Sequence, residues 1–135
     1  MIDPDETTGK AELFIDFEDR LTIFDTLVLC RFFRDLYPWE SLAELLQKVT
    51  GENINKSDLQ EISSRIADLV RRFNLREGMN PDADRLPKQL HKRLEDSGKV
   101  ITETQLKLMI TDYYHLRGWD KNGVPNRLNA GQNEP

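Results

Sequence analysis

Apolar residues recur at steps of three and four along much of this chain, which is the spacing of one face of an α-helix. Between Leu27 and Phe33 the apolar residues also spread to other faces, and a helix that is apolar on most sides is normally buried. We therefore predict a helix from Ala11 onward whose segment around Leu27–Phe33 is the centre of the domain. Pro38 is expected to break or restart the chain. The predicted stripe consists of Phe14, Phe17, Leu21, Phe24, Val28, Phe32 and Leu36.

Three later helices are predicted from start and stop signals. The candidate capping boxes, each a Ser or Thr followed three residues later by Glu or Gln, are Ser41 with Glu44, Ser57 with Gln60, and Thr102 with Gln105. For the first of these helices, Pro38 is an equally good first residue. Gly51 and Gly118 stand where helices would end. The helix after Ser57 is expected to turn its apolar positions to the core, namely Leu59, Ile62, Ile66, Leu69 and Phe73.

The remaining segments are predicted to connect these helices. Residues 74–85 show little periodicity and contain turn-forming residues, which is typical of a loop. Spaced leucines predict a short helix from Pro87 to about Gly98, and Asn122-Gly123 predicts a turn.

No stretch alternates with a period of two, so the predicted fold class is all-α, a compact bundle of about five helices. We expect a single domain over residues 11–125, preceded by a flexible acidic segment at 1–10 and followed by a flexible tail at 126–135.

Composition and charge narrow the function classes. A chain of 135 residues with 38% apolar and 32% charged residues suits one globular domain. The formal net charge of −5 argues against nucleic-acid binding, which normally requires a basic surface. The longest apolar-rich stretch is far short of the ~20 residues of a membrane span, and no signal peptide is recognised. We expect a soluble, cytoplasmic protein that binds neither nucleic acid nor membrane.

Candidate chemistry is sparse, and no catalytic residue is assigned. One cysteine excludes an intramolecular disulfide and any metal site built from this chain's thiolates alone. Cys30 lies in the most apolar segment, a position typical of a buried structural thiol. Asp25 lies in the same segment and needs a partner there. It could cap a following helical segment, or it could accept hydrogen bonds from a ligand.

Charged and aromatic clusters elsewhere have ordinary interpretations. The arginines of the third helix, Arg65, Arg71, Arg72 and Arg76, are interpreted as a solvated face that balances the acidic surface. Tyr113, Tyr114 and His115 are interpreted as core on one side of the last helix rather than as a stacking platform.

Three motifs, in order, resemble a known family. Residues 25–30 are similar to the Asp-x-x-Gly-Leu-Cys signature of tungsten-containing aldehyde ferredoxin oxidoreductases. Residues 72–78 and 84–87 resemble that family's Phe-Asn-x-Arg-Glu-Gly and Asp-x-Leu-Pro stretches, and residues 112–125 resemble its C-terminal ending. Together the motifs extend over most of residues 11–125.

The resemblance implies an enzyme that oxidises aldehydes to carboxylic acids and passes electrons through a [4Fe–4S] cluster to ferredoxin. Its tungsten is held by two pterin dithiolenes. This chain would be the last helical domain, as a fragment or a split subunit that works with the remaining domains. Cys30 would be the fourth cluster ligand, and Asp25 would bind one pterin. Leu29 and Arg31 would contribute to the same site through backbone groups. The isolated chain would be inactive, would bind no cofactor, and would self-associate through the apolar face around Asp25 and Cys30.

One residue departs from the family pattern, because Val28 stands where the signature has Gly. Glycine adopts positive φ readily and a β-branched residue does not. The stripe through Phe24, Val28 and Phe32 also predicts helix where a cofactor-contacting turn would be needed. The alternative is therefore a stand-alone helical interaction module that has lost cofactor binding.

Overall fold

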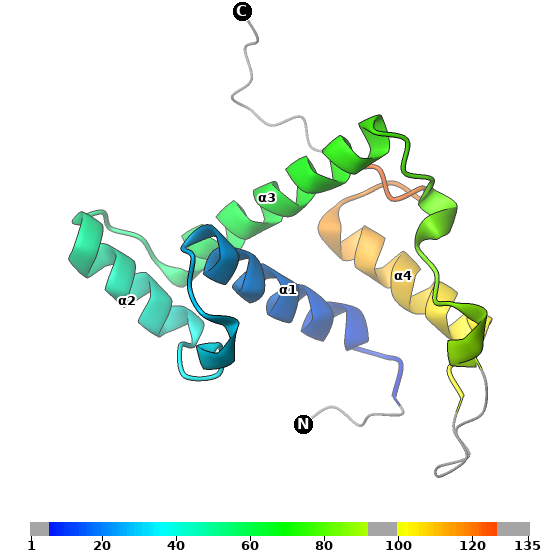
Figure 1. Ribbon diagram of the computed structural model, residues 1–135, viewed down its shortest axis with the longest axis horizontal. Coiled ribbons are helices and arrows are strands. Elements are labelled where there is room, and N and C mark those ends of the chain that lie inside the picture. Colours follow the sequence, from blue (N-terminus) through cyan, green and yellow to red (C-terminus); the bar gives the residue numbers. More distant parts are fainter. Residues whose placement is uncertain (1–5, 92–99, 127–135) are drawn as a thin grey trace, which may run out of the picture. The chain divides into compact units, whose positions relative to one another are not determined.

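The computed structural model describes residues 6–91 and 100–126 (Figure 1). The α-helices are α1 (Lys10–Thr26), α2 (Trp39–Thr50), α3 (Lys56–Arg76) and α4 (Glu103–Arg117). Short 3₁₀ turns are η1 (Arg31–Phe33), η2 (Pro81–Ala83) and η3 (Lys88–His91). These residues contain no strand and only an isolated bridge between Trp119 and Pro125, so the all-α prediction is confirmed.

Several predictions fall partly outside the described residues. The short helix expected from Pro87 is the single turn η3, and residues 92–99 are not described. Residues 1–5 and 127–135 of the two predicted flexible segments also lie outside, and Lys10 already begins α1. Within the described ranges, no helix is long and apolar enough to cross a membrane.

The chain divides into two compact units, which are described separately. The first, the α2 unit, comprises residues 14–70 and includes most of α1, all of α2 and most of α3. The second, the α4 unit, comprises residues 71–126 with the described residues before 14. The expectation of a single domain over residues 11–125 stays a prediction.

The core of the α2 unit lies where the end of α1 meets α2 and the start of α3. Phe24 is completely buried there, and the indole Nε1 of Trp39 donates a 2.8 Å hydrogen bond to Oδ1 of Asp16. The buried cluster comprises Ile23, Phe24, Trp39, Leu42, Ala43 and Leu59. The predicted centre at Leu27–Phe33 is therefore wrong. The helix α1 ends at Thr26, and of the apolar side chains that follow only Leu27 packs against the buried cluster, whereas the others up to Phe33 are exposed.

Capping residues in the sequence predicted some helix ends correctly and others wrongly. Thr102 and Gln105 form the predicted capping box of α4, and Gly51 and Gly118 adopt left-handed conformations at helix ends, as predicted. Pro38 is the N-cap of α2, one residue before the helical position predicted for it, and the capping box starting at Ser41 is wrong.

The start of α3 is displaced from the predicted box. The Asn55 side chain accepts hydrogen bonds from the amides of Ser57 and Asp58, and the Asp58 carboxylate accepts one from the Asn55 amide. The predicted core face of α3 holds for Leu59, whereas Ile62, Leu69 and Phe73 are exposed.

Candidate functional site

The signature residues 25–31 lie on the turn that ends α1. The amide of Leu29 donates to the carbonyl of Phe24 at 2.8 Å, and the amide of Val28 donates to the carbonyl of Asp25 at 3.1 Å. This pair of bonds is the Schellman motif, which requires a left-handed residue after the helix. Val28 supplies it with φ of 56°. The helix predicted to continue through Val28 and Phe32 is therefore wrong.

The same motif ends α3 and α4, with glycine at the left-handed position. Gly78 and Gly118 have φ of 92° and 70°, and Val28 is the only non-glycine residue with positive φ among the described residues. A left-handed conformation costs an L-residue about 1–2 kcal/mol. The turn therefore tolerates Val28 where the family signature has Gly, with some backbone strain.

We expect Val28→Gly to raise the free energy of unfolding by about 1 kcal/mol, because the relieved strain exceeds the added flexibility of the unfolded chain. The Val28 side chain is 90% exposed, so little burial is lost. Urea denaturation measures the change. The matched control is Gly78→Val, where no atom lies within 4 Å of an added Cβ and a loss of about 1–2 kcal/mol is expected. Destabilisation by Val28→Gly would contradict the assignment of strain.

Asp25 and Arg31 meet across this turn. Arg31 Nε donates to Asp25 Oδ1 at 2.8 Å, and the terminal nitrogen Nη2 donates to Oδ2. Both side chains are about half exposed. The hydrogen bond from Arg31 holds the pKa of the Asp25 carboxyl below its usual value. Asp25 is thus an ionised acceptor bound by a side chain, and no backbone cap of a following helix is formed with it.

Cys30 and Leu29 lie between these two residues. Cys30 is exposed and directly precedes η1, so the interpretation as a buried structural thiol is wrong. Leu29 is partly exposed, and its amide is used by the turn. Over the described part of the chain, no group of three or more His, Cys, Asp or Glu side chains is arranged to hold a metal ion. A metal bound by Cys30 would need ligands from elsewhere.

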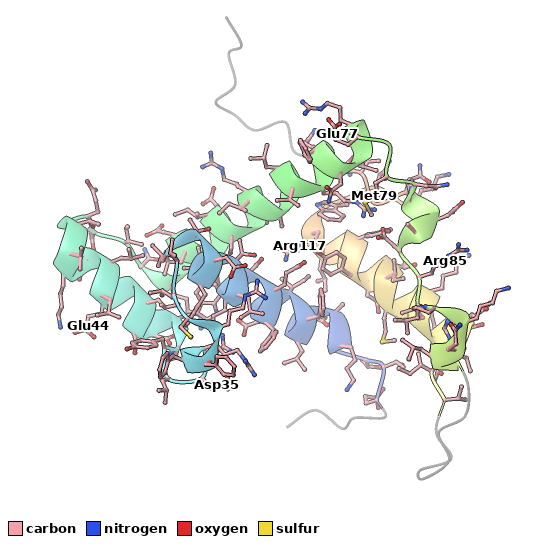
Figure 2. The ribbon with its side chains drawn as sticks, in the orientation of Figure 1. Asp35, Glu44, Glu77, Met79, Arg85 and Arg117 are labelled. Carbon is pink, nitrogen blue, oxygen red and sulfur yellow. The ribbon has the colours of Figure 1, made fainter. Side chains whose placement is uncertain are left out.

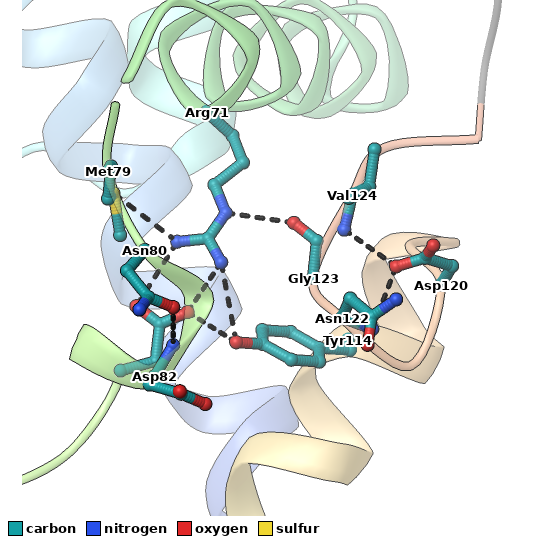
Figure 3. Close-up of polar contacts among 10 residues, drawn as sticks. Arg71, Met79, Asn80, Asp82, Tyr114, Asp120, Asn122, Gly123 and Val124 are labelled. Atoms are coloured by element: carbon teal, nitrogen blue, oxygen red, sulfur yellow. Dashed lines mark hydrogen bonds and ion pairs between the residues drawn. The ribbon is translucent and has the colours of Figure 1, made fainter. Parts of the chain in front are cut away.

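Arg71, which directly precedes the second signature region, binds residues of the other signature stretches in a largely buried polar cluster of the α4 unit. We call this cluster the Arg71 clasp (Figure 3). Arg71 Nε donates to the carbonyl of Gly123 at 2.8 Å, and its two terminal nitrogens Nη1 and Nη2 bind the carboxylate of Asp84. The Tyr114 hydroxyl donates to the same carboxylate. The Arg71 side chain is 8% exposed, so its assignment to a solvated face is wrong.

The electrostatics of the clasp follow from burial and pairing. Burial would raise the pKa of the Asp84 carboxyl, but the hydrogen bonds from Arg71 and Tyr114 outweigh it and lower that pKa. Burial, together with the bond to Asp84, raises the pKa of Tyr114 to about 12. The guanidinium of Arg71 also stacks over the Trp119 ring, 5.2 Å from its centroid. Because these groups satisfy one another, we interpret the clasp as structural.

The loop that meets Arg71 is closed by Asp120. Its Oδ1 accepts hydrogen bonds from the amides of Asn122 and Val124 at 2.8 and 2.9 Å. Gly123 is left-handed with φ of 69°, and its carbonyl is thereby presented to Arg71 (Figure 3). The predicted Asn-Gly turn is confirmed, but the sequence did not indicate that its Gly123 carbonyl binds Arg71.

Comparisons with known proteins agree with the motifs. Residues 1–130 match the family described as "Aldehyde ferredoxin oxidoreductase, domains 2 & 3". The chain is 31% identical over 125 residues to the tungsten-containing aldehyde ferredoxin oxidoreductase of Pyrococcus furiosus and 30% identical over 125 residues to that of Thermococcus kodakarensis. The Pyrococcus abyssi enzyme is 32% identical over 131 residues.

Each of these alignments covers 90% of this chain but only 21% of the relative, so the chain spans about a fifth of the length of the relatives it matches. No significant match to a solved structure was found. Because the family match extends over nearly all 135 residues, the chain belongs to the aldehyde ferredoxin oxidoreductase family, in the region of its domains 2 and 3.

Proposed function

We propose that this chain acts as the C-terminal helical part of a tungsten-containing aldehyde oxidoreductase. The intact enzyme would convert aldehydes to carboxylic acids and deliver the electrons to ferredoxin, with neither nucleic acid nor membrane as a partner. The observation that carries the proposal is the turn after α1, which keeps a left-handed residue at the glycine position of the signature and exposes the Cys30 thiol. The helices of this chain would pack in the enzyme as a compact bundle against its remaining domains.

Cys30 suits the role of a cluster ligand. Iron–sulfur clusters usually take four ligands, most often cysteine thiolates, and an exposed thiol that follows a fixed turn can be aimed at a metal without unfolding its surroundings. This chain has one cysteine, so the other ligands would come from the remainder of the enzyme. A [4Fe–4S] cluster held there would transfer electrons between the tungsten centre and ferredoxin.

Asp25 suits the role of a pterin contact. Its ionised carboxylate accepts hydrogen bonds, and a pterin ring carries N–H donors. Arg31 would keep this carboxylate charged and oriented. The amide of Leu29 is already bonded within the turn, so Leu29 would contact the pterin through its other groups.

A second candidate is a helical interaction module that has lost its cofactor. The observation in its favour is that both oxygens of Asp25 are bound by Arg31, which leaves the carboxylate paired before any cofactor arrives. The two candidates predict different effects of a Cys30 substitution on the iron content of the assembled enzyme.

Cys30→Ala, made in the enzyme assembled with this chain, is expected to lower the iron content and to reduce aldehyde oxidation at least tenfold, because one cluster ligand is lost. Iron is measured after anaerobic purification, and activity with a viologen acceptor. Val49→Ala is the control, since Val49 is exposed on α2 and distant in sequence from the turn. Full iron occupancy with unchanged activity in Cys30→Ala would favour the interaction module.

A further inference from the structure

The turn after α4 contains the only Asn-Gly pair among the 135 residues, Asn122-Gly123. It follows the last residue of α4, Arg117, which Figure 2 labels. Asparagine is thermolabile because its side-chain amide can be lost, and a following glycine makes the loss easiest, since it has no Cβ to keep its backbone nitrogen away from that side chain. Asn122 is exposed, whereas Gly123 is buried. Solvent therefore reaches the side chain that would react, while the attacking backbone nitrogen is enclosed.

Loss of the amide is a ring closure followed by hydrolysis. The backbone nitrogen of Gly123 gives its proton to a solvent base and forms a bond to Cγ of Asn122, and the bond from Cγ to the side-chain nitrogen breaks with release of ammonia. Water then opens the succinimide ring at either carbonyl, which leaves aspartate or isoaspartate in place of the asparagine. One water is consumed and one ammonia is released, with no change of oxidation state.

The hydrogen bonds around Gly123 oppose this ring closure. Its amide donates to the Asp120 carbonyl at 2.9 Å, and its carbonyl accepts from Arg71 Nε at 2.8 Å (Figure 3). The amide of Val124, on the other side of the glycine, donates to Oδ1 of Asp120 at 2.9 Å. The glycine is thus fixed on both sides, and its nitrogen can turn toward Cγ of Asn122 only if these bonds break.

The Arg71 clasp strengthens this restraint. Arg71 is itself bound to Asp84, whose carboxylate also accepts a hydrogen bond from the Tyr114 hydroxyl. The Arg71 side chain is 8% exposed, so it cannot follow the Gly123 carbonyl outward without leaving Asp84. Release of that carbonyl therefore requires a local opening within the α4 unit, and such openings are rare where buried hydrogen bonds are many.

We propose that Asn122 is a deamidation site that the Arg71 clasp protects, so that the chain is modified there only while the clasp is open. The modification is irreversible and damages the clasp that prevents it. Isoaspartate lengthens the main chain by one atom before Gly123, which moves the Gly123 carbonyl away from Arg71. The proposal concerns this chain alone and does not depend on the function proposed above.

The test is the rate at which the full chain gains the mass of deamidation in mildly alkaline buffer, measured by mass spectrometry and located at Asn122 by peptide mapping. The folded wild-type chain is expected to react at least about 100-fold more slowly than the same chain unfolded in urea, because the rate follows the population of the open form. Asp84→Ala is expected to react at least about tenfold faster than the folded wild type, because Arg71 loses its carboxylate partner. Asp82→Ala is the matched control in the same loop and is expected to react at the wild-type rate.

Two further variants complete the design. Asn122→Ser is the blank, which should gain no mass in this turn. Tyr114→Phe removes a single hydrogen bond to Asp84 and keeps the ring, so it tests the same point with less risk to the fold. It is expected to accelerate the reaction by a smaller factor than Asp84→Ala, with an unchanged helical far-UV spectrum.

Equal rates for the folded and the unfolded wild-type chain would overturn the proposal, as would equal rates for Asp84→Ala, Tyr114→Phe and Asp82→Ala. The isoaspartate product carries an additional negative charge and is separated by anion exchange. It is expected to unfold at a lower urea concentration than the unmodified chain. An unchanged urea midpoint would overturn the coupling between the modification and the clasp.

Discussion

Asp84→Ala is expected to lower the free energy of unfolding by about 3 kcal/mol, because it leaves the Arg71 guanidinium buried without its carboxylate. Breaking a buried ion pair by removing one partner costs about 3–5 kcal/mol, and Asp84 is 25% exposed, which favours the lower end. The hydrogen bond from the Tyr114 hydroxyl is lost in the same change. Urea denaturation, followed by far-UV circular dichroism, measures the difference.

The control for this variant is Asp82→Ala. Asp82 is an exposed carboxylate in the same loop, and its replacement is expected to change stability by about 0.5 kcal/mol or less. Equal effects of the two variants would show that the loop tolerates loss of either carboxylate and that the clasp contributes little.

The pH dependence of the clasp has a definite sign. The folded pKa of Asp84 lies below its usual value of 3.8, so the folded state stabilises the ionised carboxylate. The resulting stability is fully present above the unfolded pKa and is lost as the pH falls through the folded pKa. The difference between wild type and Asp84→Ala is thus expected to be constant near neutral pH and to shrink below pH ~4.

The sequence predicted best what depends on neighbouring residues. The capping box at Thr102 and the glycine ends at Gly51 and Gly118 need only a few adjacent residues, and all are confirmed. The prediction of where α1 ends was wrong for the same reason, because it too relied on neighbouring residues alone. Val28 carries no stop signal, and its apolar side chain continues a helical stripe, so nothing local indicates the left-handed turn.

Long-range pairing explains the remaining failures. Arg71 binds Asp84, 13 residues away, and Gly123, 52 residues away. The apolar pattern along α3 carries no information about partners outside the helix, so from the sequence Arg71 could be interpreted only as one of several surface arginines. The signature motif did bring Asp25, Cys30 and Arg31 to one turn, but the pairing of Asp25 with the Arg31 side chain depends on the direction in which Val28 turns the chain.

Gly123→Ala is expected to destabilise the protein by about 2–3 kcal/mol through overpacking of the clasp, in addition to the cost of its left-handed backbone. An added Cβ would lie 2.5 Å from Nη2 of Arg71 and 2.6 Å from Cζ of Tyr114. Neither side chain can yield easily, because Arg71 is bonded to both Asp84 and the Gly123 carbonyl, and Tyr114 is bonded to Asp84.

Gly51→Ala separates the two contributions. Gly51 has φ of 77°, close to the 69° of Gly123, but nothing lies within 4 Å of a Cβ added there. Its replacement should cost only the backbone penalty of about 1 kcal/mol. Urea denaturation of both variants therefore measures the packing of the clasp as the difference between them. Equal losses would mean that Arg71 and Tyr114 move aside without cost, and the clasp would then be looser than its hydrogen bonds indicate.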